Sequence, residues 1–415
     1  MEFNSAPSEI MLMDINSCFA TIEQQANPLI RGKPVAVAAF VSPGGCILAA
    51  SVEAKKLGIK TGMRVKDGKN LYRDLIVLPP DPSKYRNVHL KLKNLISKYS
   101  DDFSPKSIDE FILNLKGYPC ILDRSILDVA REIKQKIRVE VGEWITVSIG
   151  IAPNRYLAKI AAGLHKPDGL DEINKENYLD IFSGLKLTDL TGIKTANATR
   201  LNSVGIKNVL DFYEAPIWKL KAAFHSITGL YWHTRLHGYE IDNIDFARRS
   251  YGNSVALGKN LSSIRELSPI LARLTEKMSA RLRRAGYKAR GVHLSLLNKN
   301  GSFWHKGRLT DRELFDSRDF FKEAFTLLTE ANPVSPVRNI AVSAYALTPN
   351  LTSQMELFVD VVKNESLANA MDAINERWGD FTLGMGVARR GENVVLDRIA
   401  FGGIKETEEL RNPQL

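Results

Sequence analysis

The chain has 415 residues, of which 44% are apolar and 25% charged, as in an ordinary soluble globular protein of about two to four domains. Its net charge of +10 suggests a polyanionic partner, nucleic acid or an anionic membrane surface, although a solvated basic surface accounts for the totals equally well. Three cysteines without a CxxC pair argue against a structural zinc site and a fully paired disulfide framework. Neither a signal peptide nor an apolar run long enough to span a bilayer is visible, so we expect a cytoplasmic protein without a membrane segment.

Strands and helices alternate along the first 175 residues. Residues 10–15 (IMLMDI) predict a buried strand that ends at Asp14, and Asn16 or Ser17 can cap the helix that follows. Pro153 or Asn154 opens another helix, which ends at the Lys-Pro-Asp-Gly sequence 166–169. Further strands are expected within 31–40, 44–51, 111–115 and 145–151, and further helices at 52–58, 84–99 and 123–139. This order, partly that of a split βαβ unit, predicts an α+β fold with a ferredoxin-like core.

Two regions of different predicted structure follow residue 175. Residues 176–243 predict short helices separated by glycines, and the linker to the next part is expected at 240–250. A second α+β unit follows, with a helix that starts at Ser268 and Pro269 and ends at Gly286. Strands are predicted at 291–297 and 339–347, and a last helix at 366–378.

Acidic residues stand at the ends of two apolar strands. Asp14 ends one strand, and Asp109 and Glu110 precede the other, FILNL. Because neighbouring residues on a strand point to opposite faces, Asp109 and Glu110 can serve one site only if the backbone bends within 107–110. A pair of Mg²⁺ ions would explain acids beside an apolar strand, since these cations prefer carboxylate oxygens. The alternative for an isolated IDE tripeptide is a solvated turn.

The positive charge is concentrated in one region. Residues 248–308 contain fourteen lysines and arginines and two acids, so that 14 − 2 = +12 exceeds the charge of the whole chain. Runs of charge usually form solvated faces. A basic block of domain size, with Arg248, Arg249, Lys306 and Arg308 on predicted strands, also suits contact with nucleic-acid phosphates.

Several motifs together resemble the Y-family, or translesion, DNA polymerases, and most of all the bacterial polymerase IV and V branches. They are MDINSCFATIEQQANP, GKPVAV, VEAKKLGIKTGM, SIDEF and VSIGIAPNRYLAKIAAGLHKPDGL, in this order. The resemblance covers 10–175 strongly, 176–350 in layout, and 360–403 as a tail helix and strand. It implies a palm at 1–30 and 80–175, small fingers at 31–79, an all-α thumb at 176–243, a little finger with its extension at 244–403, and a tail at 404–415.

The resemblance also implies an active site. Asp14, Asp109 and Glu110 would be catalytic and would hold two Mg²⁺ ions, or Mn²⁺ as a substitute, with the carbonyl of Ile15 as a further ligand. Backbone N–H groups at a helix N-terminus suit an anion. The nucleotide-binding residues would be Ser17, Cys18, Phe19, Lys55 and Lys159. One departure is Val52, where many members have tyrosine, which removes a hydroxyl contact to the triphosphate.

Phe19 lies five residues after Asp14 and has two interpretations. As a residue on the first helix, it is an ordinary core aromatic. In the resemblance it matches the steric gate, where a flat ring under the sugar leaves no room for a 2′-hydroxyl.

Three segments imply contacts with DNA or with a DNA-bound partner. Residues 190–212 resemble a helix–hairpin–helix, which grips phosphates through backbone N–H groups, although Gly192-Ile193-Lys194 lacks the second glycine of the family's Gly-Ile-Gly. The basic block corresponds to the little finger, which holds the DNA backbone. The pentapeptide QMELF resembles a sliding-clamp motif, and an ordinary strand edge or linker is the alternative. Its contacts would be Gln354, Leu357 and Phe358.

We therefore interpret the chain as a template-directed DNA polymerase of the error-tolerant, lesion-bypass type. Its expected partners are primer–template DNA, dNTP and the bacterial sliding clamp, and we expect a monomer that binds no membrane. A nucleotidyl cyclase with a related palm remains an alternative, but it gives the basic block no role. A non-catalytic DNA-binding protein is another, and it leaves the acids unexplained.

Overall fold

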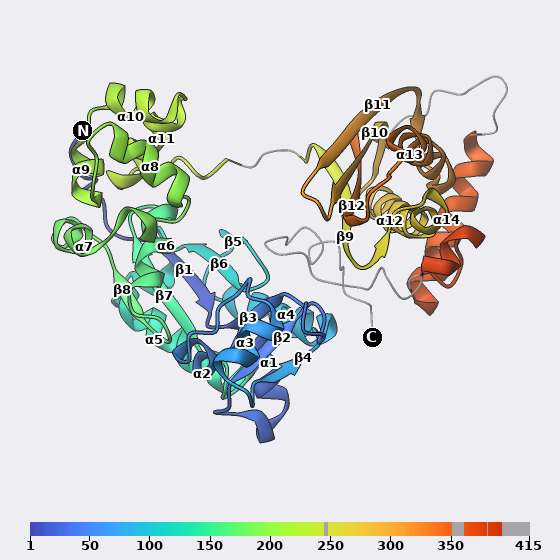
Figure 1. The fold of residues 1–415 in the computed structure, drawn as a ribbon. Coiled ribbons are helices and arrows are strands. Elements are labelled where there is room, and N and C mark those ends of the chain that lie inside the picture. Colours follow the sequence, from blue (N-terminus) through green and yellow to red (C-terminus); the bar gives the residue numbers. More distant parts are fainter. Residues whose placement is uncertain (245–247, 351–360, 380, 392–415) are drawn as a thin grey trace. The chain divides into compact units, whose positions relative to one another are not determined.

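The structure is a computed structural model and describes residues 1–244, 248–350, 361–379 and 381–391. It divides into two compact units, the first being Met1–Ile244 and the second containing the described residues from Arg248 onward (Figure 1). Among the described residues, none of the helices combines the length and apolar character that crossing a membrane requires.

A five-stranded sheet forms the centre of the first unit. Its order is β5-β6-β1-β7-β8, in which β1 pairs antiparallel with both β6 and β7. The strands are β1 (Ile10–Ile15), β5 (Phe103–Pro105), β6 (Glu110–Asn114), β7 (Val147–Ala152) and β8 (Leu170–Glu172). The helices of this part are α1 (Cys18–Ala26), α4 (Pro82–Ile96), α5 (Ile126–Lys136) and α6 (Arg155–Leu164). Strands and helices of this order confirm the predicted α+β class.

Alternation along β1 separates two cores. Met11, Met13 and Ile15 pack into a cluster with residues of α4 and α5, whereas Leu12 packs into another cluster with residues of α6. Asp14 therefore belongs to the α6 side of the sheet, at the end of the strand.

A small sheet and five short helices complete the first unit, at opposite ends of the five-stranded sheet (Figure 1). The small sheet has the order β3-β2-β4. It consists of β2 (Val35–Ala38), β3 (Ile47–Ala50) and β4 (Ile76–Leu78), with α2 (Val52–Lys56) and α3 (Val65–Leu71). The five helices are α7 (Tyr178–Gly184), α8 (Thr195–Ser203), α9 (Val209–Glu214), α10 (Ile217–Phe224) and α11 (Thr228–Leu236).

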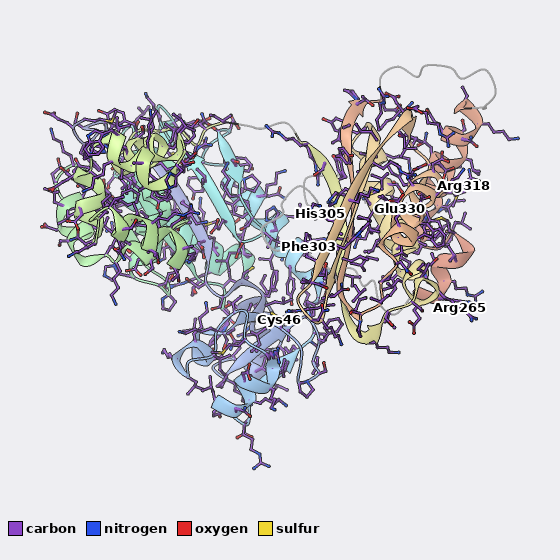
Figure 2. The ribbon with its side chains drawn as sticks, turned by 45° about the horizontal axis from the view of Figure 1, so that its top comes forward. Cys46, Arg265, Phe303, His305, Arg318 and Glu330 are labelled. Atoms are coloured by element: carbon purple, nitrogen blue, oxygen red, sulfur yellow. The ribbon has the colours of Figure 1, made fainter. Side chains whose placement is uncertain are left out.

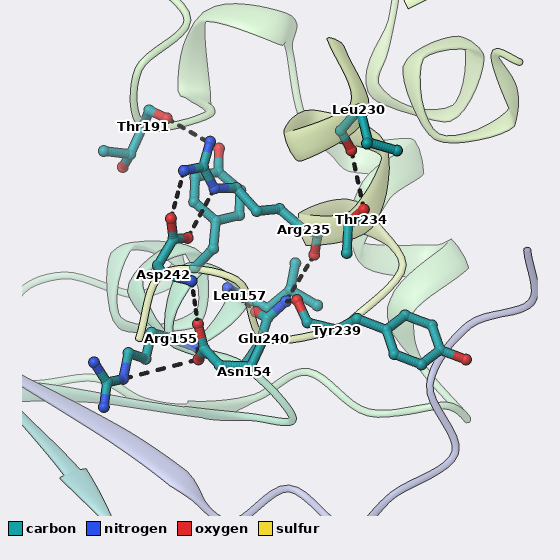
Figure 3. A network of polar contacts seen from close by, with 11 residues as sticks. Asn154, Arg155, Leu157, Thr191, Leu230, Thr234, Arg235, Tyr239, Glu240 and Asp242 are labelled. Carbon is teal, nitrogen blue, oxygen red and sulfur yellow. Dashed lines mark hydrogen bonds and ion pairs between the residues drawn. The ribbon is translucent and has the colours of Figure 1, made fainter. Parts of the chain in front are cut away.

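Asn154 joins three parts of the first unit (Figure 3). Its side chain caps α6 by accepting from the N–H of Leu157 at 2.8 Å, as predicted from the sequence. The same amide donates to the carbonyls of Arg235 and Tyr239 at 2.9 and 3.0 Å. Arg235 in turn forms an ion pair with Asp242, whose Oδ2 lies 2.7 Å from Nε. The palm helix, the end of α11 and the segment entering the linker are thus held together.

The second unit repeats a split βαβ pattern. Its sheet has the order β11-β10-β12-β9 and is antiparallel throughout. The strands are β9 (Ser250–Leu261), β10 (Tyr287–Asn298), β11 (Phe303–Leu314) and β12 (Val337–Pro349), and α12 (Ile264–Arg284) and α13 (Ser317–Ala331) pack against them in one apolar core.

The helix α12 begins earlier than the sequence analysis predicts. The predicted start at Ser268-Pro269 is wrong, because proline is common at the first position of a helix but here lies inside it. The helix is opened instead by a capping box, in which the side chain of Ser263 accepts from the N–H of Glu266 and the Glu266 carboxylate accepts from the N–H of Ser263. Pro269 therefore lies inside the helix.

The last described segment packs on α12 through charged side chains. It contains α14 (Val361–Trp378) and a short helical segment, Gly386–Gly391. Arg283 donates two bonds to Asp372, at 2.6 and 2.8 Å. The guanidinium of Arg273 lies 3.9 Å from the centre of the Phe381 ring. These contacts make the segment part of the second unit.

We expect Asn154→Ala to lower the free energy of unfolding by about 2–3 kcal/mol, because the variant loses a helix cap and also leaves two partly buried carbonyls without a donor. Asn208→Ala, which removes the exposed cap of α9, is the matched control and should cost about 1 kcal/mol. Urea unfolding of both variants measures the difference. Equal losses for the two would contradict the joining role of Asn154.

Candidate active site

The three predicted acids come together at one edge of the five-stranded sheet. Asp14 on β1 stands directly opposite Glu110 on the antiparallel neighbour β6. Asp109 comes immediately before β6, and its carbonyl accepts from the N–H of Ile15 at 2.9 Å. The side chains of Asp14 and Glu110 are only 16% and 17% exposed. Two largely buried carboxylates therefore share one face at a strand end.

The backbone bends just before β6, as use of both adjacent acids requires. The N–H groups of Lys106 and Ser107 both donate to the carbonyl of Glu110, at 2.8 and 3.4 Å. Ile108 is buried in the α4 and α5 cluster. The hydroxyl of Ser107 donates to the carboxylate of Asp109. This turn brings Asp109 to the edge where Asp14 and Glu110 face each other.

Each of the paired acids has a lysine partner. Nζ of Lys166 lies 2.8 Å from Oδ2 of Asp14. Nζ of Lys159, on α6, lies 2.8 Å from both carboxylate oxygens of Glu110. Within the described part of the chain, no three His, Cys, Asp or Glu side chains form a ready-made metal cage. The lysines thus supply the positive charge at this edge.

The charge balance at Asp14 is unfavourable in spite of its lysine. Burial raises the pKa of Asp14 to about 6, the charges of Asp109 and Glu110 add to the increase, and Lys166 opposes it. A carboxylate that burial and like charges disfavour is stabilised by a cation placed nearby. The donor set is all oxygen and carries up to three negative charges, which suits hard divalent cations such as Mg²⁺. The residues present therefore fit the predicted metal ions.

Two cavities meet at the acids. The first, of about 540 Å³, is lined by residues from Asp14 to Phe19, by part of β3 and α2, and by Lys166. The second, of about 530 Å³, is lined by Glu110, Arg155 and Lys159 among others. Asp109 lines both cavities. The acids thus lie at the junction of two spaces of ligand size.

Ser17 gives the first cavity an unused polar group. It precedes α1 with a left-handed backbone, φ 54°, and makes no side-chain cap bond. Its hydroxyl is buried and has no hydrogen-bond partner among the described residues. The first N–H groups of a helix also lack partners within it. This corner of the cavity therefore has donors available for an anion.

Phe19 is half buried and lines the first cavity. Its ring stacks on Tyr85 of α4, with centroids 4.3 Å apart and planes within 9°. The residue therefore packs on one side and borders open space on the other, which accommodates both of its interpretations.

The lysines near the acids line two different cavities. Lys55 lines the first cavity, and burial together with the charge of Lys166 lowers its pKa. Lys159 lines the second cavity, whereas Lys166, which was not singled out, lines the first. The sequence pattern indicates only that Lys166 belongs to the segment that ends α6. No local pattern reports that the turn after α6 returns to the end of β1.

The chain was compared with known proteins. The sequence model of the impB/mucB/samB family matches residues 13–163, and that of the family's C-terminal domain matches 248–357. DNA polymerase IV of Pelotomaculum thermopropionicum is 30% identical over 395 residues, which are 94% of this chain and 97% of that one. DNA polymerase IV of Moorella thermoacetica is 31% identical over 398 residues, 94% and 98% of the two chains. The chain belongs to the Y-family of DNA polymerases.

Solved structures agree with this membership. A Y-family DNA polymerase chimera of Dbh and Dpo4 superposes with a TM-score of 0.72 at 25% identity, over 82% of this chain and 99% of that one. An insertion ternary complex of Dbh DNA polymerase gives 0.56, with the same identity and coverage. The predicted palm, fingers, thumb and little-finger fold of a Y-family polymerase is therefore confirmed as a fold class, while the domain boundaries stay a prediction.

The predicted thumb residues Gly192 and Lys194 are both exposed. Gly192 has φ +94°, and a Cβ there would meet the Trp232 ring at 3.3 Å, so that a larger residue would be strained. Lys194 precedes α8 and is exposed. The missing second glycine leaves an exposed cation at the tip of the loop.

The predicted little-finger contacts fall into two groups. Arg249 is exposed, and the guanidinium of Arg248 lies 3.7 Å from the centre of the Tyr251 ring. Nζ of Lys306 and Nη2 of Arg308 each lie 2.8 Å from a carboxylate oxygen of Glu330 on α13. Glu330 is labelled in Figure 2. The charges of Lys306 and Arg308 are thus partly offset by one carboxylate within the protein, and their contact with DNA stays a prediction. The predicted clamp residues Gln354, Leu357 and Phe358 lie outside the described residues.

The placement of the lysines predicts a kinetic difference. Lys166→Ala should raise KM for dNTP by about tenfold or more, since a hydrogen bond to a charged group contributes about 1.5–3 kcal/mol. Lys159→Ala should act mainly on kcat, because Lys159 is paired with Glu110 and does not line the first cavity. Steady-state single-nucleotide kinetics separates the two parameters. A larger rise in KM for Lys159→Ala would support the original assignment from the sequence instead.

Proposed function

We propose that the polymerase joins dNTPs to a primer 3′ end at the junction of its two cavities, with the nucleotide in the first and the primer end in the second. Membership of the Y-family makes the chain a DNA-directed DNA polymerase of translesion synthesis. The observation that carries the proposal for the site is the position of Asp109. It lines both cavities, between Asp14 in the first and Glu110 in the second. In an in-line phosphoryl transfer the phosphate lies between the attacking and leaving oxygens, and acids that hold metal ions must stand beside it, within reach of both.

Asp14, Asp109 and Glu110, with the carbonyl of Ile15, would hold two divalent cations, and Mg²⁺ or Mn²⁺ would serve. When bound, these cations lower the pKa of the primer hydroxyl and stabilise the leaving pyrophosphate. The contribution of the chain is to hold carboxylates close together on a rigid strand pair. Lys166 and Lys159 balance the acids until substrates arrive.

The first cavity would hold the triphosphate and the sugar. Lys55 and Lys166 supply positive charge, and Ser17 and the first N–H groups of α1 supply donors. Val52, also in the lining, adds no hydroxyl. Phe19 presents its ring to the sugar and would exclude a 2′-hydroxyl, which is the proposed gate.

The basic second unit and the thumb would hold the primer–template DNA through its phosphates. The net charge of +12 within residues 248–308 supports this role. The sliding clamp, the monomeric state and the cytoplasm stay predictions from the sequence. The cyclase and the non-catalytic DNA-binding protein are set aside, because family membership assigns a DNA polymerase.

Replacing an acid tests the site directly. Asp14→Asn and Glu110→Gln should each reduce primer extension with Mg²⁺ to background, because a neutral amide cannot hold the cation against water. Affinity for primer–template without nucleotide should change little. Asp101→Asn, at an exposed acid of the palm, is the control and should extend normally. Near-normal extension by either acid variant would remove the two-metal assignment.

Binding to DNA should depend steeply on salt, with a log–log slope of about −0.9 for each phosphate neutralised. Arg248→Glu combined with Arg249→Glu should weaken binding to all sequences alike and flatten that slope. Lys306→Glu combined with Arg308→Glu changes the charge by the same amount and should have a smaller effect, since both cations already lie beside Glu330. Fluorescence anisotropy across a salt series measures each slope, and a flat slope in the unmodified protein would contradict the proposal.

A further inference from the structure

Tyr85 forms the floor on which the Phe19 ring rests. The two rings are nearly parallel, with centroids 4.3 Å apart, and Tyr85 is only 1% exposed. The cavity lies on the other side of Phe19. How far the Phe19 ring can move away from a bound sugar therefore depends on how firmly Tyr85 is held.

A buried carboxylate holds Tyr85. The hydroxyl of Tyr85 donates to Oε1 of Glu23 at 2.9 Å, and Nζ of Lys84 lies 2.8 Å from Oε2. Glu23 is 6% exposed. A buried carboxylate is costly unless it is paired and hydrogen-bonded, and here each oxygen has its own donor. Burial, together with the charge of Glu23, raises the pKa of Tyr85, so that its hydroxyl remains a donor at neutral pH.

Helix α1 carries both Phe19 and Glu23, the residue that accepts the hydrogen bond from Tyr85. Phe19 and Glu23 are four residues apart on α1, which places them on one face, a turn apart. Tyr85 therefore touches α1 at two points, with its ring face on Phe19 and its hydroxyl on Glu23. Lys84 stands in the first turn of α4, where Asp81 caps the helix. The first turn of α4 is thus joined to α1 through Tyr85, Lys84 and Glu23.

We propose that Glu23 is a positioning residue for sugar selection, because its hydrogen bond to Tyr85 fixes the ring that keeps Phe19 against the nucleotide. This inference rests on the proposed function and extends it to a residue that lines neither cavity. Without the bond, the Tyr85 ring can tilt and the Phe19 ring can recede. The space that opens admits a 2′-hydroxyl.

Two variants break the bond in different ways. Tyr85→Phe keeps the stacked ring and removes the hydroxyl, whereas Glu23→Ala removes the acceptor. Each should raise the ratio of kcat/KM for rNTP to that for dNTP by about three- to tenfold, or about 0.6–1.4 kcal/mol at about 1.36 kcal/mol per tenfold. Glu23→Gln keeps an oxygen for the Tyr85 hydroxyl and should restore the ratio to within about twofold, a change of about 0.4 kcal/mol.

A second tyrosine–glutamate pair in the palm provides the matched control. Tyr99 donates to Oε1 of Glu132 at 2.6 Å, and neither residue is among those that line the cavities. Tyr99→Phe should also lower the melting temperature, by less than Tyr85→Phe, because it loses the same kind of bond at a less buried carboxylate. It should leave the rNTP/dNTP ratio unchanged, which separates stability from sugar selection.

A double-mutant cycle shows whether the effect passes through Phe19. Tyr85→Phe should raise the ratio in the unmodified protein and have no further effect when Phe19→Ala is already present. The inference is overturned if Tyr85→Phe and Glu23→Ala lower the melting temperature with the ratio unchanged, or if Phe19→Ala leaves the ratio unchanged. In either case the protein still extends primers with dNTPs. Loss of dNTP extension by the unmodified protein would instead contradict the proposed function.

Discussion

Like charges facing each other across two antiparallel strands are the constraint on which the site depends. Asp14 and Glu110 are direct cross-strand partners, and such pairs of equal charge are destabilising. Asp109 adds a third acid, and burial raises the pKa of Asp14 further. Lys166 forms an ion pair with Asp14 and Lys159 with Glu110. These two pairs offset only part of the negative charge of the three acids. An edge of this kind is stable enough to fold, and it favours divalent cations that can take the place of the lysines.

Packing on both faces of the five-stranded sheet fixes the positions of these acids. The apolar side chains of β1 alternate between two cores, so that the strand cannot slip by one residue without burying Asp14 in the wrong cluster. The turn before β6 brings Asp109 round to the junction of the cavities, and α1 leaves β1 directly into the first cavity with Phe19 on it. Glu23, one turn further along α1, holds the ring behind Phe19. Metal site and sugar selection therefore share one strand–helix unit.

Short-range sequence patterns predicted much of this arrangement. They could not predict contacts between residues that are far apart in the chain. The strand ending at Asp14 and the cap at Asn154 were predictable, because apolar alternation and capping act within a few residues. Lys166 was not, since only the path of the chain after α6 returns it to Asp14. The ion pairs of Lys306 and Arg308 with α13 were likewise invisible in a count of charges. The start of α12 was misplaced because Pro269 resembled a boundary and the capping box at Ser263 was overlooked.

The proposed function implies that divalent cations replace the lysines at the acids when substrates bind. The most direct measurement is a crystal structure of the chain with primer–template, an incoming non-hydrolysable dNTP and Mn²⁺, with the metal located by its anomalous scattering. The claim predicts anomalous peaks within coordination distance of Asp14, Asp109 and Glu110. It also predicts that Nζ of Lys166 moves from Asp14 to the triphosphate. Peaks elsewhere, with Lys166 still bound to Asp14 beside an ordered nucleotide, would contradict it.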